Sequence, residues 1–129
     1  MRAFASAPPS TRRGLGMAGD RREPEDPLAF IRRCVGARRV FWSYHVNMRM
    51  RERFIARVEI LGAAATYEII ESNPGDKYLP SYLVHAAAGD RLFHVLFATD
   101  VEGDNVRVVT AYVPDPSEWA DDLKTRREP

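Results

Sequence analysis

Apolar positions in the first part of the chain recur every three or four residues, which predicts a series of short helices. Ile31 and Val35 fall on one face of a stretch from 27 to 36. Asp26 stands where an N-cap residue belongs, and Pro27 fits the first helical position. We therefore expect the folded domain to begin with this helix.

A second helix is expected over residues 45–54, where an apolar stripe runs beside a charged one. Val46, Met50 and Phe54 recur every four residues and form the stripe that faces the core. Ser43 is placed to cap this helix. A third helix is expected near 56–64, with its inner face made by Val58, Leu61 and Ala65.

Strand-like sequence follows. Strands are expected in four stretches that are rich in β-branched and aromatic residues, namely 66–71, 78–86, 91–99 and 105–113. The third stretch is almost continuously apolar, which indicates a central strand, and short turns predict an antiparallel meander. Residues 39–44 are typical of a short strand or an extended segment. A last helix is expected from 117 to 126, anchored by Trp119 and Leu123.

These elements predict one α+β domain over residues 27–129. Its N-terminal helices pack on a four-stranded antiparallel sheet, and a helix follows at the C-terminus. Residues 1–26 contain many Pro, Gly and Arg and have no periodic apolar face, so we expect a disordered N-terminal tail.

Charge is distributed unevenly, although the formal net charge is only +1. Residues 32–57 contain eight arginines and one acid, whereas residues 58–123 contain three bases and twelve acids. Such a chain either pairs its two halves internally or shows a basic face to an anionic partner. The single cysteine, Cys34, allows no internal disulfide and no apolar run is long enough for a membrane, so we expect a cytoplasmic protein.

The expected helix over 45–54 carries the first candidate chemistry. His45, Arg49 and Arg53 share a stripe beside the apolar one, at the edge of the core. Arginine offers a fixed fork of donors that suits phosphate, and a neutral imidazole is a competent general base near pH 7. The competing interpretation is a solvated face, with the arginines paired to the acidic half of the chain and His45 bonded to a carbonyl.

The expected sheet supplies further candidates. His94 lies between Leu92 and Leu96 on one face of the central strand, where its ring is either a core residue with a hydrogen-bond partner or part of a site. Thr110 and Tyr112 are expected on the same face of the last strand as two valines, Val106 and Val108.

Three more cations are candidate contacts for RNA, with surface solvation as the alternative: Arg51, Lys77 and Arg91. The sequence contains no metal-ligand spacing, glycine-rich phosphate loop or nucleophile elbow. An enzyme with this sequence is therefore expected to use His, Arg, Tyr and Thr without a metal or other cofactor.

Three segments stand in an order that is found together in one protein family. The first is His45-x-x-x-Arg49-Met50-x-x-Arg53. The second runs from Glu68 to Glu71, through the Asn-Pro-Gly-Asp turn and Lys77 to Val84, into Arg91-Leu-Phe-His94-Val95. The third is Val108-Val109-Thr110-Ala-Tyr112-Val-Pro114-Asp115-Pro116, with Trp119 and Lys124 to Arg127. Together they resemble, over about residues 28–127, a bacterial family catalogued as domain of unknown function forty-two fifty-eight. Leu79 and the alanine-rich loop at 86–89 depart from the family's pattern.

This resemblance implies a fold and a function. The family looks related to RelE-type toxins and barnase-like ribonucleases, and its genes often stand beside an MqsA-type zinc-finger antitoxin. The chain is then expected to be the toxin-like component of a type II toxin–antitoxin pair, with RNA and a cognate antitoxin as partners.

The leading hypothesis is a metal-independent endoribonuclease that acts on mRNA. His45 or His94 would deprotonate a ribose 2′-hydroxyl, and Arg49 and Arg53, with Lys77, would stabilise charge on the phosphate. Tyr112 would stack a base and Thr110 would position it. Two alternatives stay open: a non-catalytic interaction module that docks an acidic protein partner, and a nucleic-acid binder that does not cleave.

Overall fold

The computed structural model describes residues 22–128. Most of the expected disordered tail, residues 1–21, therefore lies outside the described residues. Of the tail's last five residues, Pro24 is buried and Asp26 caps the first helix. The elements, in chain order, are α1 (Pro27–Gly36), β1 (Val40–Trp42), α2 (Tyr44–Glu52), α3 (Arg57–Gly62), η2 (Ala64–Thr66), β2 (Glu68–Asn73), β3 (Ser81–Ala88), β4 (Arg91–Asp100) and β5 (Asn105–Tyr112).

The strands form one mixed sheet in the order β1-β5-β4-β3-β2. Strands β2 to β5 make the expected antiparallel meander. The expectation of a four-stranded antiparallel sheet is wrong at one edge, because β1 adds a fifth strand parallel to β5, with Val40 opposite Val106 and Trp42 opposite Val108. Residues 39–44 were expected to form a short strand or an extended segment, and β1 lies within them, but a partner more than sixty residues away leaves no local signal of the pairing. The α+β class itself is confirmed.

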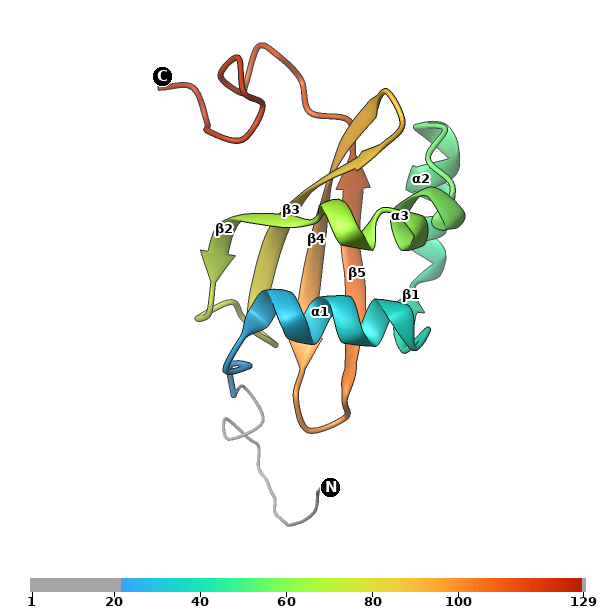
Figure 1. Cartoon of the computed structure of the whole chain (residues 1–129), viewed down its shortest axis with the longest axis vertical. Coiled ribbons are helices and arrows are strands. Elements are labelled where there is room, and N and C mark those ends of the chain that lie inside the picture. Colours follow the sequence, from blue (N-terminus) through green and yellow to red (C-terminus); the bar gives the residue numbers. More distant parts are fainter. Residues whose placement is uncertain (1–21, 129) are drawn as a thin grey trace.

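Helices cover one face of this sheet. Figure 1 shows α1 crossing in front of the strands and α2 standing beside β5. Asp26 caps α1 by accepting from the backbone N–H of Ala29 at 3.1 Å, as its position predicts. The core combines three residues of α1 with Ile60 of α3 and with alternate residues of the strands, the α1 residues being Ile31, Cys34 and Val35.

Two details of the expected helices are wrong. Phe54 does not join the apolar stripe of α2, because the helix ends at Glu52 and Phe54 follows with a positive φ of 56° and 83% exposure. Val58 is 74% exposed and Ala65 is also exposed, so the inner face expected for the third helix is wrong, and Ile60 is the buried residue of α3. Val46 and Met50 are buried as predicted.

A β-bulge interrupts β5 beside β4. Leu96 pairs with Thr110 but Phe97 pairs with Val108, so Val109 is the extra residue. The bulge reverses the alternation of β5, which explains why Thr110 and Tyr112 do not share a face with Val106 and Val108 as expected. Tyr112 instead lies opposite His94, on the sheet face away from the core.

The expected helix over 117–126 is absent, and this segment is a series of turns. Asp122 accepts hydrogen bonds from the backbone N–H groups of Lys124 and Thr125, at 2.9 and 3.2 Å. Such side-chain bonds compete with helical ones, and Leu123 adopts a positive φ of 58°. Trp119 is nevertheless the anchor that was expected, because it is 2% exposed and packs on the ring of His94.

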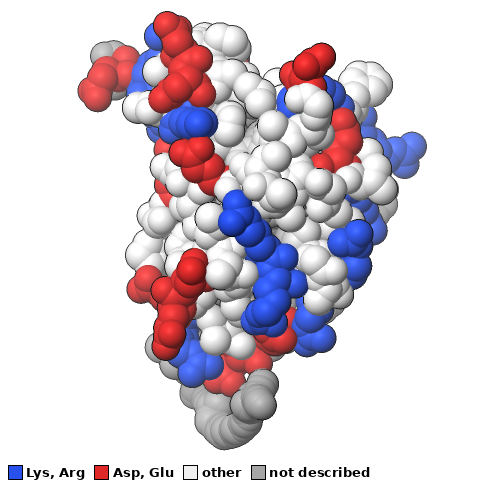
Figure 2. Space-filling model, in the orientation of Figure 1, with Lys and Arg blue, Asp and Glu red and all other residues white. Residues whose placement is uncertain are grey.

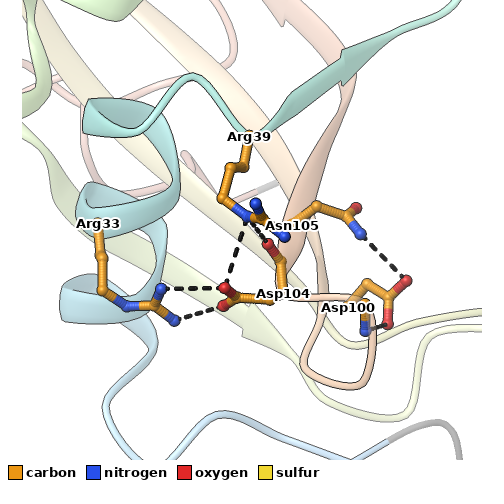
Figure 3. A network of polar contacts seen from close by, with 6 residues as sticks. Arg33, Arg39, Asp100, Asp104 and Asn105 are labelled. Atoms are coloured by element: carbon orange, nitrogen blue, oxygen red, sulfur yellow. Dashed lines mark hydrogen bonds and ion pairs between the residues drawn. The ribbon is translucent and has the colours of Figure 1, made fainter. Parts of the chain in front are cut away.

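A polar network fixes the β4–β5 loop to α1 and to the start of β1 (Figure 3). Asp104, at φ 55°, accepts from both terminal nitrogens of Arg33, at 2.6 and 3.3 Å. Its backbone carbonyl accepts from Nε of Arg39 at 2.7 Å, and the carbonyl of Arg39 accepts from the N–H of Val106 at 3.1 Å. These contacts start the parallel pairing of β1 with β5.

Candidate functional site

A pocket of about 260 Å³ opens where β1 stops and β5 continues alone. The last β1–β5 pair is Trp42 with Val108, and the chain then turns into α2, which lies along the part of β5 that β1 does not cover. The bulge at Val109 falls at the same place. The pocket is lined by His45, Val46, Arg49, Arg53, Val109, Thr110 and Ala111.

Arg53 is the most firmly held side chain of this pocket. Its Nη1 donates to the carbonyl oxygen of Ala111 at 2.9 Å and lies 3.4 Å from Oγ1 of Thr110. Neither partner carries a formal charge, so these bonds orient the guanidinium without neutralising it. An oriented and uncompensated guanidinium at a pocket wall is suited to bind an anion.

His45 and Arg49 reach the pocket from the first two turns of α2 and are both exposed. Ser43 caps the helix by accepting from the N–H of Val46 at 3.0 Å. This bond fixes the start of α2 and therefore the position of His45 in its first turn. Arg49 has a carboxylate near it, Glu52, at 3.9 Å, but both side chains are more than half exposed. Such a surface pair is weak and leaves the Arg49 fork available to a ligand.

The cations of the chain divide into two sets. The first set lies within 3.5 Å of a carboxylate oxygen and consists of Arg33, Arg39, Arg91, Arg107, Lys124, Arg126 and Arg127. Within residues 22–128, by contrast, no ion pair holds Arg51, Arg53 or Arg57. In Figure 2, Lys and Arg side chains line the right of the view, where Figure 1 places α2. Internal pairing and a basic face therefore both occur, in different parts of the chain.

His94 does not reach this pocket. Its ring is fully buried, its Nε2 donates to the carbonyl oxygen of Leu123 at 2.7 Å, and its Nδ1 lies 3.4 Å from the hydroxyl of Tyr112. Burial lowers the pKa of His94, so the ring is neutral, and Nδ1 is then an acceptor for the Tyr112 hydroxyl. The structure thus places His94 on the sheet face that the C-terminal segment covers, where its ring packs on Trp119.

Tyr112 is half-buried beside that histidine. Its ring centroid lies 5.4 Å from that of His94, and burial raises the pKa of its phenol. The hydroxyl is therefore a neutral donor directed at His94 rather than at the pocket. Of the six residues that the sequence suggested for catalysis, the structure brings together four: His45, Arg49, Arg53 and Thr110.

The three suggested RNA contacts lie outside the pocket. Arg51 is exposed on α2 but does not line the pocket. Lys77 lies over the ring of Tyr78, 5.1 Å from its centroid. Arg91 donates to both carboxylate oxygens of Glu59, at 2.8 and 2.9 Å, and to the carbonyl of Phe54.

Two features of the site carried no clear sequence signal. The carbonyl of Ala111 holds Arg53, and a backbone acceptor is independent of residue type. The second feature is a neighbouring hollow of about 330 Å³, lined by Phe41, Trp42, Ser43, Arg107 and Val108. The alternation of Val40, Phe41 and Trp42 does indicate that Phe41 leaves the sheet opposite to its neighbours.

Over residues 22–128, no group of three or more His, Cys, Asp or Glu side chains is placed to hold a metal ion. No helix in that same range is long and apolar enough to span a membrane.

One family model matches the chain, over residues 42–113, and its description is Domain of unknown function (DUF4258). The match is shorter than the 28–127 expected, since it leaves out α1 and the C-terminal turns. All seven residues that line the His45 pocket fall inside it. No curated protein and no solved structure matches the chain.

Proposed function

The chain belongs to the family Domain of unknown function (DUF4258), and from the pocket within the family segment we propose that it is a metal-independent endoribonuclease acting on mRNA. One observation carries the proposal: a histidine, two arginines and a threonine from α2 and β5 converge on one open pocket. This set can supply a base, an anion clamp and a hydroxyl, which are the groups that cleavage by the ribose 2′-hydroxyl needs.

The reaction assigns one role to each group. His45 removes the proton from the 2′-hydroxyl, and the 2′-oxygen attacks the adjacent phosphorus. The bond from phosphorus to the 5′-oxygen breaks, and the leaving oxygen takes the proton of the imidazolium, either directly or through a water molecule. The products are a 2′,3′-cyclic phosphate and a free 5′-hydroxyl, and His45 returns to its neutral form.

The two arginines act on the charge of the phosphate. Arg53 is pre-oriented by Ala111 and Thr110, so binding requires little ordering of its side chain. Arg49 is free to move onto the second non-bridging oxygen. His94 has no place in this scheme, because its ring is buried and both of its nitrogens are engaged.

The test is cleavage of an unstructured RNA by purified protein in the presence of a chelator. We expect cyclic-phosphate products from the wild-type protein, and at least a hundredfold slower cleavage by H45A and by R49A. R51A is the comparison variant, because it removes the same charge from the same helix at a position outside the pocket; as a candidate RNA contact, Arg51 should affect the binding of RNA but not the maximal rate of cleavage. Equal rates for H45A, R49A and the wild-type protein would reject the assignment.

The resemblance to ribonuclease toxins extends the proposal to the cell. We propose that the chain is the toxin-like component of a type II toxin–antitoxin pair, supported by the resemblance and by the open basic pocket. Expression of the chain alone should stop growth, and co-expression of the adjacent gene should restore it. If H45A stopped growth as strongly as the wild-type protein, the toxicity would not depend on cleavage by His45.

A second candidate function is a non-catalytic module that docks an acidic protein. It is favoured by three exposed apolar side chains on and after α2, since Tyr44, Phe54 and Val58 are 80%, 83% and 74% exposed, and by Arg51, which no ion pair holds within residues 22–128. It predicts a stable complex with the adjacent gene's product, no growth arrest and no cleavage. The chelator assay and the growth assay together distinguish the two functions.

A further inference from the structure

The hollow beside the His45 pocket has the lining of a nucleobase site. Phe41 is 60% exposed, although it belongs to a strand, and its register partner in the parallel pair is Arg107. Paired residues leave a sheet on the same face, so the ring and the guanidinium stem stand side by side. An exposed aromatic ring beside a cation is a surface on which a base can stack.

The hollow and the pocket lie next to each other along β5. Ser43 lines the hollow and accepts a hydrogen bond from the N–H of Val46, which lines the pocket. Val108 of the hollow and Val109 of the pocket are consecutive residues of β5. A phosphate at His45 and Arg53 would therefore have the hollow directly next to it, where the base of the attached nucleotide must lie.

The charges around the hollow favour a polyanion over an apolar or basic partner. Arg107 lies on its wall, and the guanidinium of Arg57 sits 5.0 Å from the ring centroid of Trp42. One carboxylate is close, that of Asp100, which is 3.3 Å from Arg107. The exposed ring of Phe41 beside Arg107, next to an anion pocket, offers one surface for a base and another for its phosphate.

We propose that Phe41 stacks an unpaired base of the RNA, so that the substrate is single-stranded. This inference rests on the proposed function, because it places the base relative to a phosphate in the His45 pocket. A base inside an A-form helix is stacked on its neighbours and cannot lie flat on a side chain. Duplex RNA of the same sequence is therefore excluded from the hollow.

The test measures binding without cleavage. A fluorescently labelled 2′-O-methyl oligoribonucleotide, which lacks the attacking hydroxyl, is titrated with the full chain and followed by anisotropy. We expect F41L to weaken binding of the single strand about tenfold, because leucine keeps the apolar bulk but not the ring, and F41W to restore it. F54L is the matched control, since Phe54 is also exposed, at 83% against 60% for Phe41, but lies outside both linings.

Further arms make the result decisive. We expect the same sequence as a duplex to bind at least tenfold more weakly, and an oligomer with abasic sites to lose its sensitivity to F41L. The proposal is overturned if F41L binds like the wild-type protein, if F54L loses as much as F41L, or if the duplex binds as tightly as the single strand. It is also overturned if polyglutamate binds equally well and with the same dependence on Phe41, because the face would then recognise an acidic protein.

The outcome is separable from that of the nuclease test. If the single strand binds in a way that depends on Phe41 but ordinary RNA is not cleaved, the base site is supported and the nuclease proposal is rejected. Cleavage that depends on His45 but is unchanged in F41L keeps the nuclease and rejects the base site.

Discussion

The guanidinium of Arg53 donates a 2.9 Å hydrogen bond to the carbonyl oxygen of Ala111, three residues beyond the last position at which β1 pairs with β5. A side chain thus takes up an acceptor that a longer β1 would have used. The end of α2 is thereby attached to the strand edge, and the space between them is the His45 pocket.

Loss of this bond should be measurable as a loss of stability. We expect R53A to lower the free energy of unfolding by about 1–2 kcal/mol, because a half-buried carbonyl loses a charged donor. R51A, on the exposed side of the same helix, should change it by less than about 0.5 kcal/mol. Urea titration of both variants checks this. Equal effects would mean that the Arg53 contact does not hold the helix to the strand.

The contact between Arg33 and Asp104 should depend on salt. The pair is bidentate but about half exposed on the arginine side, so we expect D104N to cost about 1 kcal/mol at low ionic strength. Asparagine tolerates the positive φ of this position, which isolates the effect of charge. Thermal unfolding at low salt and in 1 M salt measures it, and the difference should shrink as salt rises. A loss that is the same at both salt concentrations would rule out an electrostatic cause.

Truncation of Trp119 should be among the most damaging single changes. The indole is 2% exposed, lies 4.5 Å from the His94 ring and carries the guanidinium of Arg126 on its other side, at 4.6 Å. We expect W119A to cost about 3–5 kcal/mol because it leaves a large cavity, and W119F to cost less. Denaturant unfolding of the two variants provides the comparison. A small loss in W119A would mean that the C-terminal turns are not required for the fold.

Stability should fall in mildly acidic solution. Burial lowers the folded-state pKa of His94, and also that of His85, below the ordinary 6.5. The unfolded chain then binds protons that the folded chain does not, so stability is greatest above pH 6.5. It declines as the pH drops from 6.5 towards the folded-state values, by at most about 1.4 kcal/mol per unit for each histidine. The charged groups around the two rings are Glu68, Glu71, Asp122, Lys124 and Arg126.

Replacing one of the two histidines tests whether they cause the loss of stability at mildly acidic pH. H94Q can still donate to the carbonyl of Leu123 but does not titrate, so its stability should depend less steeply on pH between 6.5 and 5. Unfolding at a series of pH values gives both slopes. Identical slopes for H94Q and the wild-type protein would assign the effect to other groups.

Cys34 should be inert towards thiol reagents while the chain is folded. Its side chain is fully buried in the core, and burial raises the pKa of the thiol to about 11. Since the thiolate is the reactive form, labelling at pH 8 should proceed only through unfolding. The rate of colour release from a disulfide reagent, with and without urea, checks this. Fast labelling of the native protein would contradict the buried position.

The local parts of the fold could be predicted from the sequence. Asp26 and Ser43 cap the helices that they were expected to cap, and the meander of β2 to β5 follows from short turns between strands. These features depend on neighbouring residues, whose chemistry is visible in the chain. The convergence of His45, Arg49 and Arg53 belongs to the same class, because one short helix carries the first two and ends at the third.

Long-range features could not be predicted in this way. The pairing of β1 with β5, the bulge at Val109 and the acceptor role of Ala111 each depend on a partner far along the chain. The C-terminal helix was expected because Trp119 and Leu123 have helical spacing. That spacing was overridden by Asp122, whose side chain bonds the backbone N–H groups that follow it.

The family match ends at 113, yet the folded core does not. Ile31, Cys34 and Val35 come before the matched range, and Trp119 comes after it. A fragment limited to residues 42–113 would expose the face of the sheet that α1 covers, and it would expose His94, which Trp119 covers. The matched segment contains the His45 pocket but only part of the core, so we expect it to need α1 and the C-terminal turns in order to fold.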